Sequence, residues 1–189
     1  MSYELQALTF LVQVAFGLYL LAVLLRLLLQ WARADFRNPV ARLVLRVTDP
    51  LVVPLRRIVP GVGGIDLATV LLALALQALE LVVLGLLLGH VPGPAGLVVG
   101  SLAALAGFVI QIYTVTIIVE AVLSWIAPGG AHPLAWLLMQ LNAPVLRPFR
   151  RLVPSVGGID LSPLVALIVL QLVQILVVQR LADWGRLLG

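Results

Sequence analysis

The sequence contains no cysteine, so this chain cannot supply a disulfide, a thiolate nucleophile, a cysteine-ligated iron–sulfur cluster or a covalent c-type haem. It also lacks a P-loop, an HExxH motif and a recognisable Ser-His-Asp set, and its two histidines leave few general-base schemes. Its eight acidic residues are scattered along the chain, which is unfavourable for a carboxylate metal site. We therefore expect no catalytic residue, no cofactor and no metal, and we do not expect an enzyme.

Charge is scarce as well. Only 11% of the residues are charged, 62% are hydrophobic, and the mean hydropathy is +1.17. Three segments carry no charge at all, Leu5–Leu25, Val91–Val119 and Leu161–Gln179, and a fourth, Leu67–Gly89, carries only Glu80. Each is long enough to cross about 30 Å of hydrocarbon as a helix. The sequence therefore predicts an all-α membrane protein with four transmembrane helices.

The chain repeats itself. The segment PLRRIVPGVGGIDL, beginning at Pro54, returns 94 residues later as PFRRLVPSVGGIDL, with 11 of 14 positions identical. We interpret residues 1–94 as a first repeat, with spans at about 5–31 and 67–89, and residues 95–189 as a second, with spans at about 97–126 and 161–182. Because two spans per repeat is an even number, both copies enter the membrane in the same direction. The expected relation is a pseudo-two-fold axis along the membrane normal.

Arginine placement predicts the orientation. All basic residues other than histidine are arginines, and nine of the twelve lie in the two connections between paired spans. By the positive-inside rule, both connections are cytoplasmic and both termini lie outside. His90 and His132 then fall at opposite membrane faces, too far apart to share a metal or a haem. The basic charge needs no nucleic acid to explain it, and we expect none.

Each cytoplasmic connection begins with a helix signal and continues with prolines. Asn38-Pro39 and His132-Pro133 can each start a helix, which we expect to lie at the membrane surface in the first copy. The second copy is almost wholly apolar and is predicted either to pack against the bundle or to dip into lipid. Prolines at positions 50, 54 and 60 and at positions 144, 148 and 154 argue against a continuous helix through either connection.

The end of each connection carries arginines, glycines and an aspartate. One interpretation is a turn followed by a helix cap, with the aspartate accepting from the first amides of the next span. The other is a site for a lipid headgroup or another anion, or for a partner protein. The candidate residues are Arg56, Arg57, Gly63, Gly64, Asp66, Arg150, Arg151, Gly157, Gly158 and Asp160.

Polar residues also lie inside the predicted spans. They can be hydrogen-bonding contacts between helices, a polar path for ions or protons, or an interface with a partner. The set consists of Tyr19, Arg26, Gln30, Gln77, Glu80, Tyr113, Glu120, Ser124, Gln171 and Gln174. Arg26 and Glu120 occupy equivalent positions with opposite charges, so we predict that they form a salt bridge across the repeats; Glu80 is a competing partner for Arg26.

Small residues predict close packing between the second and third spans on the outer side. Gly85 and Gly89 form a GxxxG pair, and Gly96, Gly100 and Gly107 follow after a short turn. A contact between chains is the alternative use.

These motifs resemble the YggT family of small integral membrane proteins, which includes YlmG and plastid CCB3. The resemblance covers essentially the whole chain and rests on P-x-R-R-x-x-P-x-x-G-G-x-D-L in both copies, together with Trp31, Asn38-Pro39, Thr48-Asp49-Pro50, Trp125 and Asp160-Leu161-Ser162-Pro163. In the second copy His132 replaces the Asn and Ala143 the Asp.

The resemblance implies a multi-pass membrane protein, located in a bacterium in the plasma (inner) membrane, without an agreed biochemical activity. Bacterial members are associated with cell division, osmotic tolerance and ion homeostasis, and plastid relatives with cytochrome assembly and nucleoid organisation. We predict a non-enzymatic scaffold or assembly factor that binds anionic lipid, or another membrane or division protein, through its cytoplasmic arginine and glycine connections. The alternative is a homo-oligomeric channel or transport component for ions or osmolytes that uses the intramembrane polar residues.

Overall fold

The computed structural model describes residues 2–61, 64, 66–126, 132–153 and 160–189. These form α1 (Tyr3–Trp31), α2 (Pro39–Ile58), α3 (Leu67–Leu88), α4 (Pro94–Ile126), α5 (Pro133–Leu152), α6 (Ser162–Val173) and α7 (Gln179–Leu187). A five-residue π-helix, η1 (Gln174–Val178), joins α6 to α7 without a break. All regular structure in the described part of the chain is helical, as the sequence predicts.

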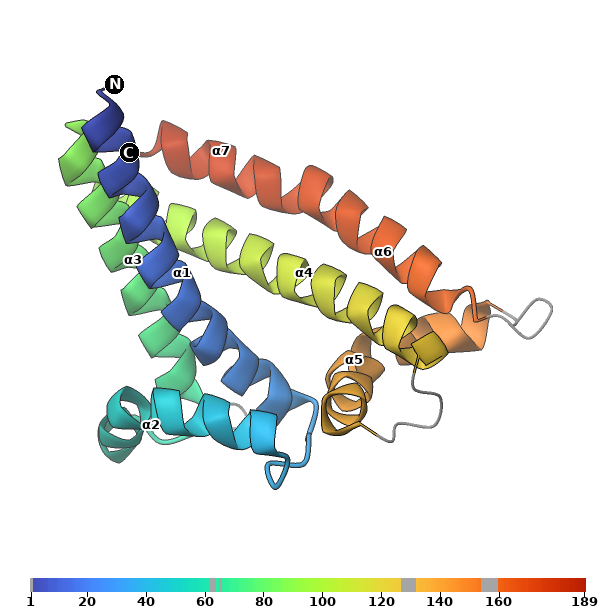
Figure 1. Cartoon of the computed structure of the whole chain (residues 1–189). Coiled ribbons are helices and arrows are strands. Elements are labelled where there is room, and N and C mark those ends of the chain that lie inside the picture. Colours follow the sequence, from blue (N-terminus) through green and yellow to red (C-terminus); the bar gives the residue numbers. More distant parts are fainter. Residues whose placement is uncertain (1, 62–63, 65, 127–131, 154–159) are drawn as a thin grey trace.

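Four helical segments are long and apolar enough to span a membrane, which confirms the predicted number of spans. They are Tyr3–Trp31, Leu67–Leu88, Pro94–Ser124 and Ser162–Leu187. Both chain termini lie at one end of the bundle, and the shorter helices α2 and α5 lie toward the other end (Figure 1). Many apolar side chains on the spans stay exposed or only partly buried, because the solvent for these surfaces is lipid.

The two halves of the chain use the same element order. A long span is followed by a 20-residue helix and then by a second span, and the bounds of α5 lie 94 residues after those of α2 at both ends. This matches the repeat offset in the sequence. The starts of α2 and α5 also touch, since Asn38 Nδ2 donates to the Pro133 carbonyl oxygen at 2.7 Å.

The predicted helix starts are confirmed, but the predicted break at the prolines is wrong. Asn38 and His132 cap α2 and α5 through their side chains, and each helix then continues past two prolines. In α2, Pro50 and Pro54 are four residues apart and exposed, so the carbonyls that they leave without helical partners share one outward side. Val52 on the opposite side is completely buried, and this packing outweighs the local loss. The helix bends instead of ending (Figure 1).

The apolar core lies where the first span of each repeat meets its short helix. Leu20, Val23 and Leu24 of α1 are buried there together with Ile117 of α4 and Leu141 of α5. The α2 side chains that face this core are Ala41, Val44, Thr48 and Val52, spaced three or four residues apart along one side of the helix. The core therefore fixes α2 and α5 against the spans.

The small residues of α4 pack chiefly against a different helix from the one predicted. Although α3 and α4 do contact each other, a Cβ added at Gly96 would lie 2.7 Å from the Gly185 carbonyl oxygen of α7. One added at Gly185 would lie 2.9 Å from the Gly100 backbone nitrogen. Gly85 instead gives room to the backbone of the turn at His90. The sequence predicted that the glycines of α4 face α3, the preceding span along the chain. Instead they lie closest to α7 of the same repeat, where the backbones of the two helices cross.

Candidate functional site

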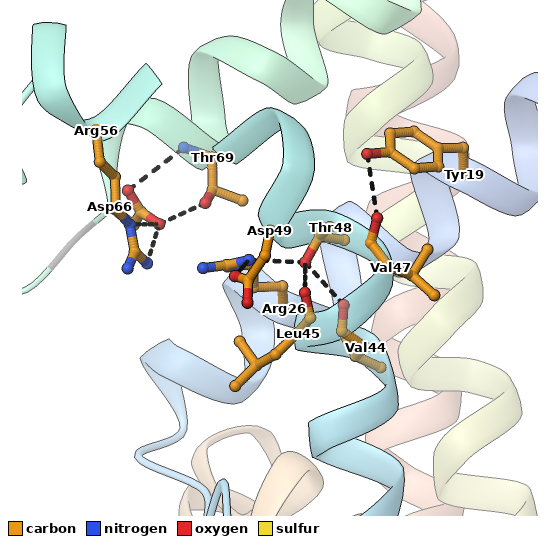
Figure 2. Close-up of polar contacts among 10 residues, drawn as sticks. All are labelled: Tyr19, Arg26, Val44, Leu45, Val47, Thr48, Asp49, Arg56, Asp66 and Thr69. Carbon is orange, nitrogen blue, oxygen red and sulfur yellow. Dashed lines mark hydrogen bonds and ion pairs between the residues drawn. The ribbon is translucent and has the colours of Figure 1, made fainter. Parts of the chain in front are cut away.

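A buried arginine links the first span to α2. Arg26 is only 2% exposed, and its Nη1 donates to Thr48 Oγ1 at 2.8 Å and to Asp49 Oδ1 at 2.7 Å (Figure 2). Thr48 in turn donates to the Val44 carbonyl oxygen one turn earlier. Tyr19 Oη donates to the Val47 carbonyl oxygen at 3.4 Å. We call the Arg26, Thr48 and Asp49 contact the first clamp.

The second repeat makes a contact at equivalent positions with the charge reversed. Asn142, which corresponds to Thr48, is completely buried and donates through Nδ2 to Glu120 Oε2 at 2.7 Å. Thr116 Oγ1 donates to the Asn142 side-chain oxygen at 2.8 Å. Arg150 Nη2 lies 3.4 Å from Glu120 Oε1 and supplies the opposite charge. We call the Glu120, Asn142 and Arg150 contact the second clamp.

The predicted salt bridge between Arg26 and Glu120 is therefore wrong, because each residue pairs within its own repeat. The competing partner Glu80 is also engaged elsewhere, since its Oε2 accepts from Gln77 Nε2 at 2.8 Å. A sequence signal for the observed pairing exists. The second copy has Ala143 in place of Asp49, so an arginine at the Glu120 position would lose its acidic partner.

Each repeat also carries an arginine–aspartate pair at the start of its second span. Asp66 Oδ2 accepts from Arg56 Nε at 3.0 Å and from Thr69 Oγ1, and its Oδ1 accepts from the Thr69 amide (Figure 2). Asp160 Oδ2 accepts from Arg150 Nε at 3.1 Å. Asp66 is the N-cap of α3, as predicted. In the second repeat the N-cap residue of α6 is Leu161, and Asp160, one residue earlier, accepts from the Ser162 amide at 2.9 Å.

These contacts lower the pKa of both carboxyls. Burial alone would raise the pKa of Asp66, but the hydrogen bonds from Arg56 and Thr69 and the charge of Arg56 outweigh it. Burial likewise opposes the lowering at Asp160, where bonds from Ser162 and Arg150 prevail. Both carboxylates thus stay ionised in the folded protein at neutral pH.

The pairs favour the turn-and-cap interpretation for part of the candidate set. Asp66 pairs with Arg56, and Asp160 pairs with Arg150. All four arginines at positions 56, 57, 150 and 151 are exposed, and Arg57 and Arg151 have no ion pair among the described residues. Gly64 adopts a φ of +84°, which explains the glycine at that turn. The candidates Gly63, Gly157 and Gly158 lie outside the described residues.

A cavity of about 1050 Å³ lies between the spans and brings four of the predicted polar residues together. Gln77 and Glu80 of α3 line it with Gln171 of α6 and Gln174 of η1. Gln171 and Gln174 are the repeat equivalents of Gln77 and Glu80. Three further polar lining residues, Gln111, Thr114 and Gln179, were not among the predicted set. The π-helix that begins at Gln174 was not predicted either, because the sequence offers no clear signal for it.

The remaining intramembrane candidates do not join this cavity. Gln30 lines a separate cavity of about 490 Å³ with Arg56 and Asp66. The side-chain oxygens of Gln30 and Tyr113 are buried without a hydrogen-bond partner among the described residues. Ser124 donates to the Ala121 carbonyl oxygen of its own helix.

Comparison with known proteins identifies relatives of this chain. The sequence pattern of the CCB3/YggT family matches residues 5–87 and again residues 99–181, one match in each repeat. The chain belongs to the CCB3/YggT family. It is 42% identical over 177 residues to an uncharacterised Pseudomonas aeruginosa protein, an alignment that covers 92% of this chain and 89% of the relative. It is 37% identical over 187 residues to the Escherichia coli K12 protein YggT, with 96% and 94% covered.

A Vibrio alginolyticus relative, known as a protein in the proC 3′ region, is 41% identical over 167 residues, with 87% of this chain and 90% of the relative covered. No solved structure matches the chain. The two CCB3/YggT matches support the tandem repeat, and the four apolar helices together with bacterial relatives indicate a bacterial membrane protein in a lipid bilayer.

Proposed function

We propose that this CCB3/YggT protein is a non-enzymatic membrane scaffold that uses α2 and α5 to bind anionic lipid at the cytoplasmic surface of the inner membrane. The observation that carries the proposal is the division of α2 into three faces. One face packs on the spans, a second is apolar and exposed, and a third bears arginines. Such a helix can lie along a bilayer surface while it remains attached to a transmembrane bundle.

The apolar face of α2 has no protein partner among the described residues. Its first four members recur every three or four residues, and the fifth follows two turns later; they are Val40, Leu43, Val47, Leu51 and Ile58, which are 36% to 81% exposed. On a helical wheel this stripe lies beside the buried stripe of Ala41 and Val52, so it points sideways from the bundle. Acyl chains at the headgroup boundary can cover it.

The arginine face supplies the charge complement. Arg42, Arg46 and Arg57 are exposed on the side of α2 away from the buried stripe. A basic side chain near an anionic bilayer surface contributes about 1 kcal/mol to the attraction. Guanidinium groups also bind phosphate oxygens in a bidentate manner. The combined apolar and arginine faces therefore suit anionic phospholipid.

The second short helix extends this surface with a different composition. In α5 the equivalents of Leu43 and Val47 are Leu137 and Leu141, and both are buried. Its exposed side carries Trp136 and Met139, with Arg147 and Arg151 near the end. Because Asn38 links the two helix starts, α2 and α5 form one surface on which a partner can assemble.

The rival function, an oligomeric conduit for ions or osmolytes, receives less support from the geometry. The large cavity runs from the terminal end of the bundle, at Pro92 and Arg186, to Gln77 and Gln171 near the middle of their spans. Its lining residues come from α1, α3, α4, α6, η1 and α7. A conduit would need to continue past α2 and α5.

A lipid titration tests the scaffold proposal. Full-length protein in a neutral detergent is titrated with phosphatidylglycerol or with phosphatidylcholine, and the thermal unfolding midpoint is recorded. We expect phosphatidylglycerol to raise the midpoint more than phosphatidylcholine does. Changing Arg42, Arg46 and Arg57 together to Gln should remove most of this difference, because these side chains make no structural ion pair in the described residues.

The matched control is Arg180→Gln, an exposed arginine on α7 near the terminal end of the bundle, compared with Arg46→Gln alone. We expect Arg46→Gln to reduce the anionic preference and Arg180→Gln to leave it unchanged. Equal effects of the two lipids on the unaltered protein would refute the proposal, as would a full preference in the triple variant.

A further inference from the structure

One buried hydrogen-bond acceptor in the cavity between the repeats lacks a donor, and a carboxylate in the same cavity accepts a single hydrogen bond among the described residues. Gln174 Oε1 is buried and has no hydrogen-bond partner among the described residues. The Glu80 carboxylate, which can accept about four bonds, accepts one, from Gln77. Both side chains line the same cavity, inside the membrane-spanning part of the chain. Unmatched acceptors in a low-dielectric interior are costly, so this pattern indicates a missing donor.

The ionisable residues that line the cavity are unevenly placed along it. Glu80 is its only acidic lining residue, and the two other ionisable lining residues, His90 and Arg186, lie at the terminal end of the bundle. Arg186 is already paired with Asp183. An ionisable residue within a span marks a functional site unless it has a compensating partner, and Glu80 has only an amide. A ligand that balances the site must therefore be positively charged.

The size of the cavity and the residues that line it limit the class of ligand that can bind. About 1050 Å³ is of the order of pockets for organic ligands and far larger than a bare ion. Apolar side chains such as Leu81, Phe108 and Val178 form much of the remaining wall. Among the described residues no group of three acidic or histidine side chains gathers to hold a metal ion. The ligand that fits this cavity is a cation with N–H donors at one end and a carbon chain at the other.

The π-helix places Gln174 for this role. A π-turn inserts one residue into the helix and turns side chains away from their regular positions, and such insertions are frequent at functional sites. Here η1 begins at Gln174 itself. Gly107 of α4 lies opposite, since a Cβ added there would lie 3.4 Å from Gln174 Nε2 and 3.6 Å from Gln174 Oε1.

We propose that this cavity binds an organic monocation through its primary or secondary ammonium group. The ammonium would donate to the Glu80 carboxylate and to Gln174 Oε1, and the apolar wall would hold its carbon chain. Gln111, Thr114 and Gln171 supply further oxygen atoms along the wall. The site lies in the spans and is independent of the lipid surface on α2.

Butylammonium chloride is the probe, and its binding to full-length protein in detergent is measured by isothermal calorimetry and by the thermal unfolding midpoint. Butyltrimethylammonium, which lacks N–H donors, and potassium chloride at equal ionic strength are the comparison ligands. We expect saturable binding of butylammonium and at least about tenfold weaker binding of both comparison ligands, because a hydrogen bond to a charged group is worth that much or more.

Two variants test the assignment. Glu80→Gln should weaken butylammonium binding by about 10- to 100-fold, and Gln174→Leu by about 3- to 10-fold. Glu4→Gln, at an exposed acid near the start of α1, is the matched control and should bind as the unaltered protein does. Binding measured with Gln174→Leu keeps the test available if Glu80→Gln fails to fold.

Three results would overturn the proposal. The first is no saturable binding of butylammonium to the unaltered protein. The second is binding that survives unchanged in both cavity variants. The third is equal or tighter binding of potassium, which would exclude the ammonium group as the recognised feature.

Discussion

At the scale of single residues, the two clamps explain why equivalent positions carry opposite charges. Arg26 needs Asp49 and Thr48, and Glu120 needs Asn142 and Arg150. Both repeats have a polar contact between the first span and the short helix. The charged residue on the span is positive in the first repeat, Arg26, and negative in the second, Glu120. A buried charge without its partner is strongly unfavourable, so the charged residue of a clamp and the side chains that pair with it must change together.

A double-mutant cycle tests the first clamp. Arg26→Leu, Asp49→Leu and the double variant are compared by the free energy of unfolding in detergent–SDS mixtures. We expect a coupling of about 1–2 kcal/mol, less than for a fully buried pair because Asp49 is 47% exposed. The exposed Arg186–Asp183 pair, changed in the same way, is the control and should show little coupling. Additivity at Arg26 and Asp49 would contradict the clamp.

The lowered pKa of Asp66 makes a pH-dependent prediction. A carboxyl whose pKa falls on folding stabilises the protein above its unfolded pKa of about 3.9, and this contribution is lost as the pH falls through the folded value. Asp66→Asn keeps a capping side chain but removes the charge. The stability difference between the unaltered protein and this variant should be largest well above the unfolded pKa and shrink as the pH falls through the lower folded pKa. A difference that grows on acidification would have the wrong sign.

At the scale of helices, the α4–α7 crossing depends on glycine. A Cβ at Gly185 would lie 2.9 Å from a backbone nitrogen and 3.0 Å from the Cα of Gly100, and backbone atoms cannot yield as a flexible side chain can. Gly185→Ala should therefore lower stability by about 1–3 kcal/mol. Gly17→Ala is the control, because its Cβ would meet nothing within 4 Å and alanine favours the helix. Equal stability of the two variants, measured by thermal unfolding, would remove the steric explanation.

The features that the sequence predicted correctly depend on residues that are close to one another along the chain. Helix starts at Asn38-Pro39 and His132-Pro133, the Asp66 cap and the four apolar spans follow from local chemistry or from length. The partners of Arg26, the crossing of Gly96 with Gly185 and the cavity at Glu80 join segments that are distant in sequence. Periodicity identifies the face on which a residue lies but not the helix that covers it. The continuous helix through Pro50 shows tertiary packing outweighing a local rule.

At the scale of the whole molecule, the arginine distribution predicts a single orientation in the membrane. Reporter fusions after Gly93 and Gly189 should report an outside location, and fusions after Gly61 and Val153 should report a cytoplasmic one. The reason is that nine of twelve arginines lie in the two connections between paired spans. A cytoplasmic C-terminus would require the opposite orientation and would place α2 and α5 on the wrong side for the proposed lipid contact.

The central claim is that α2 lies in the bilayer surface with its apolar stripe in lipid and its arginines in water. Because the chain has no cysteine, single cysteines can be introduced at successive positions from Val40 to Ile58, spin-labelled and reconstituted into bilayers that contain phosphatidylglycerol. Accessibility to oxygen should peak at Leu43, Val47 and Leu51 and recur every three to four residues, while accessibility to a water-soluble nickel reagent should peak at Arg42, Arg46 and Arg57. If both reagents reach the two sets of positions equally, α2 stands clear of the membrane and the proposed lipid-binding scaffold is wrong.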